Sequence, residues 1–217
     1  MREYHKIETL FERDADFRVT SVLKRQVFAD IAKWIVTEKV DGTNIRVSKV
    51  RGEPLVKVGG RTDKAQTPAD LVNLLHTMFT PEKMDGLFTE DSSPVARITL
   101  FGEGYGAGIQ KGGHYRPDKS FILFDVLIEV GEESWWQDDA VVTDFAARLG
   151  CDRVPILGEW VFGEIVERVK AGVVGKLAPD YLAEGIVART REPLFDSRGR
   201  RLILKLKTKD FIGGKMS

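Results

Sequence analysis

The chain has 217 residues, of which 42% are hydrophobic and 30% charged, which supplies one sizeable core and excludes a disordered or fibrous protein. Lysine plus arginine and aspartate plus glutamate each total 33, so the formal net charge is zero and any polyanion site must be local. A single cysteine, a charged start and the lack of a long apolar run predict a cytoplasmic protein without a membrane partner.

Strands and turns alternate over residues 34–58. WIVTEKV is an apolar strand, DGTN is a break, and IRVSKV and LVKV flank a turn at 51–54, an order that predicts an antiparallel meander. Thr67 and Pro68 then mark the N-cap and first turn of an amphipathic helix over residues 71–79.

The second half of the chain continues this mixture. Residues 95–103 and 120–130 are typical of strands, and we expect the glycines of GEGYGAGIQKGG to lie between them. Asp138 or Asp139 can cap a helix that Gly150 ends, and a second helix is expected over 163–170. Residues 182–189 and 200–207 predict a hairpin. The irregular order favours an α+β fold of largely antiparallel sheets, in a single domain over residues 1–217 with no C-terminal accessory domain.

Two common kinds of site are not supported by the sequence. A phosphate-binding P-loop needs Ser or Thr after its lysine, but Lys111 is followed by Gly112, and the glycine-rich stretch leads to Tyr115 and Pro117 instead of opening a helix. The three histidines and Cys151 lack the spacing of zinc ligands.

Three lysines are candidates for chemistry. Lys39 ends an apolar strand just before a turn, where its neighbours could hold the amine in a pocket as a nucleophile. Lys205 and Lys207 alternate with leucines, so both project from one face of a strand. The alternative for all three is an ordinary solvated lysine at a strand end or on a strand face.

The motifs that accompany Lys39 form an ordered series. In chain order they are EKVDGTN, GGRTDKAQ, FGEGYGAGIQKG, SFILFDV, AEGIVAR and LKLKTKDF. In this order and at this spacing they resemble the covalent nucleotidyltransferase superfamily of ATP-dependent ligases and capping enzymes, and most closely the RNA ligase 2 family. The resemblance implies that family's fold, in which two antiparallel β-sheets with flanking helices form a nucleotide-binding cleft.

The resemblance also implies roles for individual residues. Lys39 would carry AMP as a phosphoramidate, while Lys205 and Lys207 would stabilise charge at the α-phosphate. Glu184 would support transfer assisted by Mg²⁺ or Mn²⁺, as a metal ligand. The nucleotide-binding residues would be Glu38 at the adenine edge, Val40, Asp41, Asn44, Arg61 at a phosphate, Glu103 at the ribose and Phe121 stacked on adenine.

The implied function is an ATP-dependent RNA ligase that joins 5′-phosphate and 3′-hydroxyl ends through a lysyl-AMP intermediate, as in RNA repair. A basic stretch over residues 198–209 is where we expect phosphate contacts to concentrate. Asp41 stands where many RNA ligase 2 members have histidine, and aspartate there is usual in DNA ligases and capping enzymes. The resemblance therefore supports adenylylation more strongly than it supports RNA over DNA as the substrate. A capping-type guanylyltransferase, a DNA ligase core, a non-catalytic module that binds nucleic-acid ends and a requirement for an accessory subunit stay open.

Overall fold

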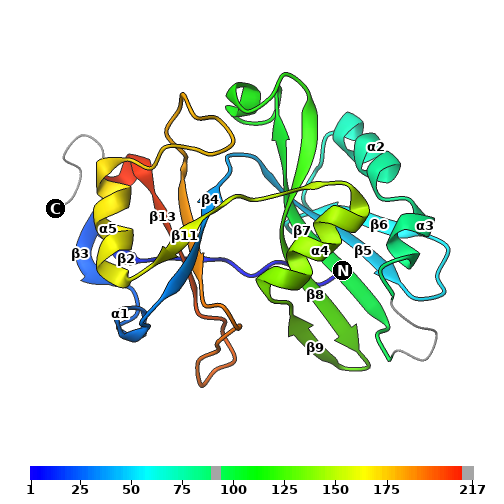
Figure 1. The fold of residues 1–217 in the computed structure, drawn as a ribbon, viewed down its shortest axis with the longest axis horizontal. Coiled ribbons are helices and arrows are strands. Elements are labelled where there is room, and N and C mark those ends of the chain that lie inside the picture. The colour runs from blue at the N-terminus through cyan, green and yellow to red at the C-terminus, as the bar shows by residue number, and fades with distance from the viewer. Residues whose placement is uncertain (89–93, 212–217) are drawn as a thin grey trace. The chain divides into compact units, whose positions relative to one another are not determined.

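The computed structural model describes residues 1–88 and 94–211 (Figure 1). Its contacts divide the chain into two compact units. We call residues 6–40 and 154–211 the Lys39 unit, and residues 1–5 and 41–153 the Glu103 unit. The single domain predicted over residues 1–217 includes residues outside the described ones and stays a prediction. None of the described helices is long and apolar enough to cross a membrane.

A five-stranded sheet forms the Lys39 unit. Alternate residues of its central strands, such as Val36, Ala188 and Leu204, point to one face and are fully buried there, where Ile165 and Val169 of a helix cover them. The strands in spatial order are β1 (Glu8–Thr9), β13 (Ile203–Lys207), β12 (Gly185–Arg189), β4 (Trp34–Lys39) and β11 (Ile156–Trp160). The other elements are β2 (Phe11–Arg13), β3 (Val19–Leu23), α1 (Val27–Asp30), α5 (Phe162–Ala171) and the 3₁₀ helix η2 (Thr208–Asp210).

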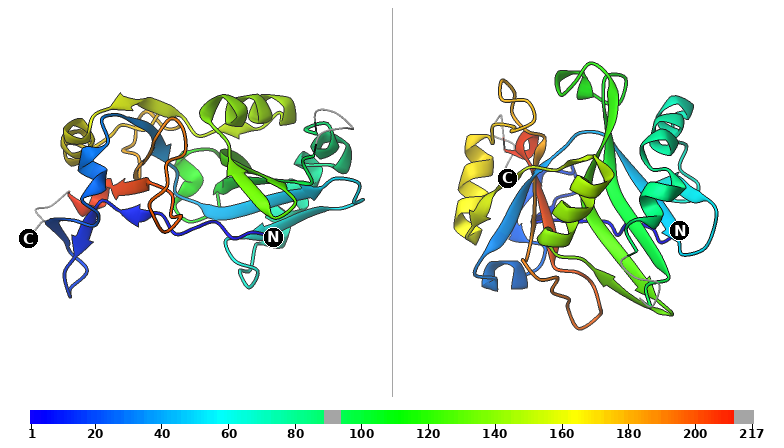
Figure 2. Two further views of the ribbon diagram at one scale, coloured as in Figure 1. Left: turned by 90° about the horizontal axis from the view of Figure 1, so that it is seen from below. Right: turned by 45° about the vertical axis from the view of Figure 1, so that its right-hand side comes forward.

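The Glu103 unit is built on a six-stranded sheet. One face carries apolar residues such as Ile45 and Leu100, and three helices bury it, α4 among them (Figure 2). The strands are β10 (Asp152–Arg153), β8 (Lys119–Val130), β7 (Arg97–Gly106), β5 (Thr43–Val50) and β6 (Val56–Gly60), with β9 (Glu133–Trp136) paired to β8. The helices are α2 (Ala69–Met78), α3 (Pro81–Asp85), α4 (Asp139–Leu149) and the 3₁₀ helix η1 (Gly112–His114).

Several predicted elements are confirmed. The Asp138 side chain accepts a hydrogen bond from the backbone N–H of Val141 at the start of α4, and Gly150 ends that helix with a left-handed backbone. The helix predicted over 163–170 is α5, and β12 and β13 pair antiparallel as the predicted hairpin. The α+β architecture with mostly antiparallel strands is therefore as expected.

The predicted meander over residues 34–58 is wrong at its first strand. β5 pairs with β6 as expected, but β4 pairs with β11 and β12 in the other sheet. The chain changes sheet at the Asp41–Gly42 turn, so a break that reads as a hairpin in the sequence joins two sheets. Local alternation cannot distinguish these outcomes, because both need the same turn.

Two local predictions also differ from the structure. The N-cap of α2 is Pro68, not Thr67, and no side chain caps this helix. The glycines at 102, 104 and 106 lie within β7 and not between strands. A side chain at position 102 would collide with the ring of Phe121, so a glycine in mid-strand makes room for a core aromatic residue.

Candidate active site

A row of three residues crosses the Lys39 unit at one end of its central strands. Lys39 is the last residue of β4 and lies opposite Gly185 of β12, which in turn lies opposite Lys207 of β13. Residues paired in this way share a face of the sheet. The two lysines therefore flank a position that has no side chain.

Glu184 fills the space between the two lysines. Its Oε2 accepts a hydrogen bond from Lys39 Nζ at 2.5 Å, and its Oε1 accepts one from Lys207 Nζ at 2.6 Å. The side chains of Glu184, Lys39 and Lys207 are 15%, 21% and 26% exposed, so all three stay accessible. One carboxylate thus holds two ammonium groups, and the row carries a net positive charge.

The ionisation of Glu184 reflects this arrangement. Burial disfavours the carboxylate, but the charge of Lys39, the hydrogen bonds from Lys207 and Lys39 and the charge of Lys207 outweigh it, so the pKa lies below its ordinary value. Glu184 is therefore an anion at neutral pH.

Gly185 permits the close approach of these strands. A Cβ at this position would collide with the backbone carbonyl of Leu206 in β13. The sequence pattern EG before an apolar strand is a signal for this role, and Gly185 is absent from the residues predicted for the site.

Lys205 lies on the same face as Lys207, as the alternation of β13 predicts. It is half-buried and lies opposite Val187 of β12 and Thr9 of β1. The structure thus places Lys39, Glu184 and Lys207 in direct contact and Lys205 one step further along the face.

Glu38 points to the opposite face of β4 from Lys39. Its buried Oε2 accepts hydrogen bonds from the backbone N–H groups of Lys176 at 2.7 Å and Leu177 at 3.2 Å. These contacts hold the segment before β12, while the Oε1 atom of Glu38 is buried with no hydrogen-bond partner among the described residues, so the adenine contact expected for Glu38 stays a prediction. Val40, which follows Lys39 and was also predicted to bind the nucleotide, is buried.

In the Glu103 unit, Asn44 and Glu103 lie opposite each other on β5 and β7, and Glu103 lies opposite Ile122 of β8. This row occupies the face of the sheet opposite the helix-covered core. The Asn44 Oδ1 atom is buried and has no hydrogen-bond partner among the described residues. An unpartnered buried acceptor beside a carboxylate is a place where a ligand's N–H or O–H group would be favoured.

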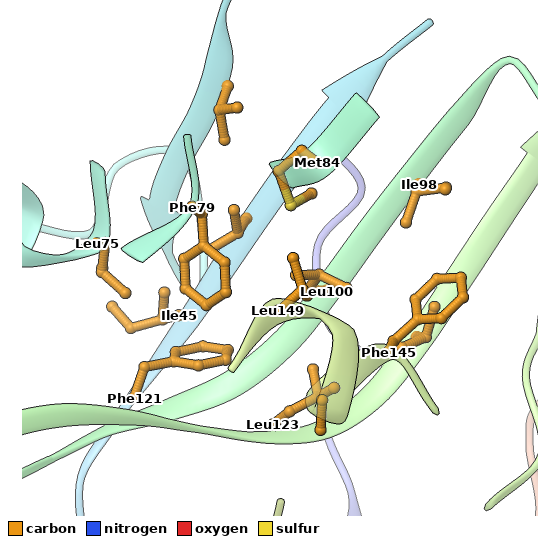
Figure 3. Packing of buried hydrophobic residues seen from close by; sticks show 14 of the residues in the cluster. Ile45, Leu75, Phe79, Met84, Ile98, Leu100, Phe121, Leu123, Phe145 and Leu149 are labelled. Carbon is orange, nitrogen blue, oxygen red and sulfur yellow. The ribbon is translucent and has the colours of Figure 1, made fainter. Parts of the chain in front are cut away.

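Phe121 departs from its expected role. Its ring is fully buried in the helix-covered core, where it packs edge-on against Phe79 with ring centroids 5.0 Å apart (Figure 3). It offers no free face to a base in this structure. Ile122 is the residue of this strand that shares the face of Asn44 and Glu103, and the sequence analysis overlooked it because both faces of β8 are apolar.

Two further predicted residues lie at turns of the Glu103 unit. The backbone N–H of Asp41 donates a hydrogen bond to the hydroxyl of Tyr115 at 3.2 Å, which ties the turn after Lys39 to the glycine-rich segment. Arg61 follows the last residue of β6 and is exposed, with no hydrogen bond or ion pair to any other described residue. Its guanidinium is available to an anion.

The basic stretch over residues 198–209 is only partly available. Asp196 accepts hydrogen bonds from the backbone N–H groups of Arg198 and Arg200, and its carboxylate also pairs with the side chains of Arg200 and Arg25. The backbone N–H of Arg200 is the largest cause that lowers the pKa of Asp196 to about 2. Part of the positive charge at the hairpin tip is therefore neutralised within the fold.

A protein-family model described as RNA ligase matches residues 32–207. Solved structures of Naegleria gruberi RNA ligase are similar in fold. The structure with PPi gives a TM-score of 0.65 at 18% identity, over 95% of this chain and 60% of that chain. A variant with ATP and Mn gives 0.62 at 18% identity, over 83% and 50%, and one with AMP and Mn gives 0.62 at 19%, over 83% and 51%. The chain spans about half the length of the first of these relatives.

Proposed function

The chain belongs to the RNA ligase family, and on that premise we propose that it joins 5′-phosphate and 3′-hydroxyl ends of RNA at the expense of ATP, with Lys39 as the nucleophile. The observation that carries this proposal is the contact of one carboxylate, Glu184, with the ammonium groups of both Lys39 and Lys207. A purely structural ion pair would need one lysine. Two lysines on an accessible carboxylate leave positive charge for a phosphate.

The first step is the formation of lysyl-AMP. The neutral Lys39 amine attacks the α-phosphorus of ATP, a nitrogen–phosphorus bond forms, the bond from that phosphorus to the bridging oxygen breaks, and pyrophosphate leaves. Lys39 must lose a proton to attack, and Glu184 Oε2 is the hydrogen-bonded acceptor 2.5 Å away. Lys207 and Lys205 then stabilise the negative charge that grows on the phosphoryl oxygens.

Two further steps complete the reaction. The RNA 5′-phosphate attacks the lysyl-AMP phosphorus, which breaks the nitrogen–phosphorus bond and leaves a 5′-adenylylated end. The 3′-hydroxyl then attacks the end phosphate, a phosphodiester bond forms and AMP leaves. The motif resemblance favours the RNA ligase 2 branch, RNA repair as the setting and the cytoplasm as the location.

The described residues contain no group of three or more acidic, histidine or cysteine side chains that could cage a metal ion. Mg²⁺ is commonly held by one or two carboxylates together with substrate phosphates, so Glu184 fits an ion that enters with ATP. Such an ion would polarise the phosphoryl oxygens when bound. With Glu184 engaged by such an ion, the Lys39 and Lys207 ammonium groups would be free to turn toward the phosphate.

Asn44 and Glu103 support nucleotide binding in this proposal. The unpartnered Asn44 Oδ1 is an acceptor for an N–H or hydroxyl group, and the Glu103 carboxylate suits ribose hydroxyls. Ile122, on the same face, takes the apolar role that the sequence assigned to Phe121. Asp41 and Val40 belong to the turn that follows the nucleophile.

Covalent labelling tests the proposal. The protein is incubated with ATP and Mg²⁺ or Mn²⁺, and intact-mass measurement should show one added AMP, which peptide mapping places on Lys39. Lys39→Ala should stay unlabelled, whereas Lys33→Ala, an exposed lysine before the same strand, should label normally. Labelling of Lys39→Ala would refute the assignment, and stronger labelling by GTP than by ATP would favour a guanylyltransferase.

A further inference from the structure

Arg46 is a fully buried cation in the middle of β5. Its Nε donates to the backbone carbonyl of Gly60 at 2.6 Å, and one terminal nitrogen donates to Asp63 Oδ1 at 2.8 Å. The other terminal nitrogen donates to the carbonyls of Met1 and Arg2 at 2.9 and 3.2 Å. Burying a guanidinium is costly unless its donors are paired, and here they are paired with one turn and with the amino-terminal segment.

The turn that Arg46 holds is the one that presents Arg61. The two anchor points, Gly60 and Asp63, lie immediately before and two residues after Arg61, and the backbone N–H of Ala65 closes the turn by donating to Thr62 at 3.1 Å. Arg61 itself is exposed and makes no contact of its own among the described residues that would fix it. The position of its backbone therefore depends on Arg46, together with Glu3, whose Oε1 accepts a hydrogen bond from the backbone N–H of Asp63 at 3.3 Å.

We infer that Arg46 is a positioning residue, which fixes the turn over residues 60–63 so that the Arg61 guanidinium meets a phosphate of the substrate. The inference rests on the proposed function for the identity of the substrate. A bidentate contact requires that two N–H groups of the guanidinium approach the phosphate in a defined orientation. If the turn that carries the arginine were flexible, binding would cost the conformational entropy of that turn. Arg46 removes that cost in advance.

The competing explanation is that Arg46 only holds the amino-terminal segment in place through the carbonyls of Met1 and Arg2. Asp63, the exposed partner of Arg46, allows the two explanations to be tested separately. The Asp63 side chain is 68% exposed, so Asp63→Ala leaves no core cavity and leaves the contacts with Met1 and Arg2 in place. Tyr4→Phe is the reverse control, because it removes the hydrogen bond from the Tyr4 hydroxyl to Asp125 and so loosens the amino-terminal segment, while it removes no contact of Arg46 or Asp63 themselves.

The test is a double-mutant cycle with Asp63→Ala, Arg61→Ala and the double variant, read by equilibrium binding of ATP and of 5′-phosphorylated RNA, with 5′-hydroxyl RNA as reference. Asp63→Ala should weaken one of the two phosphate ligands about tenfold, within the range measured for coupled neighbours. In the Arg61→Ala background it should add no further loss. Asp63→Asn, which keeps an acceptor oxygen, should restore binding, and Tyr4→Phe should lower the melting temperature but leave binding unchanged.

The inference would be overturned if Asp63→Ala weakened binding as much in the Arg61→Ala background as it does in the wild-type protein. Wild-type affinity of the Asp63→Ala variant would overturn it as well. So would a matching loss of binding in Tyr4→Phe. Loss for ATP identifies the nucleotide phosphates as the partner, and loss for RNA identifies the 5′-phosphate. If the wild-type protein never forms lysyl-AMP, the proposed function is refuted. The double-mutant cycle still tests the role of Arg46 in that case, because ligand binding can be measured without catalysis.

Discussion

The two ends of the β12–β13 hairpin each carry an acidic residue surrounded by cations, and the two acids are held in different ways. At one end, the only partners of the Glu184 side chain among the described residues are the ends of two lysine side chains. At the other end the Asp196 side chain receives two backbone N–H groups as well as arginine side chains. Both carboxylates are anionic, and their pKa values are both lowered.

The difference lies in what must move if the acid is to change partners. Lysine ammonium groups sit on flexible stems and can turn toward a phosphate without any change of backbone. The N–H groups of Arg198 and Arg200 are part of the turn itself, so their release would unfold the hairpin tip. We conclude that the Glu184 end is arranged for exchange and the Asp196 end for stability.

The largest expected effect is on the rate at the Glu184 end. Lys207→Ala should slow lysyl-AMP formation by about 10²- to 10³-fold, because it removes a cation that acts on charge developing in the transition state. The leucines on the opposite face of β13 stay packed, so the melting temperature should change little. Single-turnover labelling and thermal melts measure the two quantities.

Lys209→Ala is the matched control, since Lys209 is an exposed lysine two residues further on. It should label at the wild-type rate. Lys205→Ala should lower the rate in the same direction as Lys207→Ala. If either Lys205→Ala or Lys207→Ala labels normally and melts normally, that lysine is only a charge on a strand face.

The second prediction compares one glycine from each end. Gly185→Ala should destabilise the fold by about 3 kcal/mol, because its methyl group would collide with the Leu206 carbonyl in the adjacent strand. Gly199→Ala, at the tip, meets nothing within 4 Å and should cost only about 1 kcal/mol for its left-handed backbone, with φ at 70°. Urea unfolding gives both values. Equal losses would show that the strands at Gly185 can separate freely.

These two ends also show what the sequence could predict. The hairpin and the shared face of Lys205 and Lys207 followed from an alternation of period two, which is a local property. The contact of Lys39 with Glu184 did not, because these two residues are 145 positions apart in the chain and meet only through the pairing of β4 with β12. The family resemblance nominated both residues, but only the sheet places them in contact.

Other features of the site could not be placed from the sequence, for reasons that are also physical. Both faces of β8 are apolar, so its pattern could not tell that Phe121 faces the core and Ile122 the other side. Glu38 and Lys39 are adjacent on a strand, and period two already implied that they point to opposite faces. The basic stretch was counted by charge alone, and counting could not detect that Asp196 neutralises part of it.

The third prediction concerns pH and the tip. The pKa of Asp196 is about 2, below its ordinary 3.8, so its stabilising effect is complete above about pH 4 and is lost as the pH falls toward 2. Asp196→Asn should therefore melt at a lower temperature than wild type at pH 6, and the difference should shrink between pH 4 and 2. Glu192→Gln, in the same hairpin, should melt like wild type throughout. A difference that stays constant with pH would contradict this assignment.

The smallest expected effect is on RNA binding by the tip. Ile203 and Lys207 are four steps apart on β13, which is about 13 Å of strand, and Arg198 lies beyond Ile203 in the connecting loop. That separation exceeds the screening length of about 8 Å at physiological salt, so Arg198 should not contribute to the charge around Lys39.

Each lost phosphate contact would reduce the slope of log affinity against log salt by about 0.7 on single strands. Arg198→Ala should leave that slope at its wild-type value in a titration of 5′-phosphorylated RNA across salt concentrations. A reduced slope would mean that the tip binds the polynucleotide, and the two ends of the hairpin would then share the substrate.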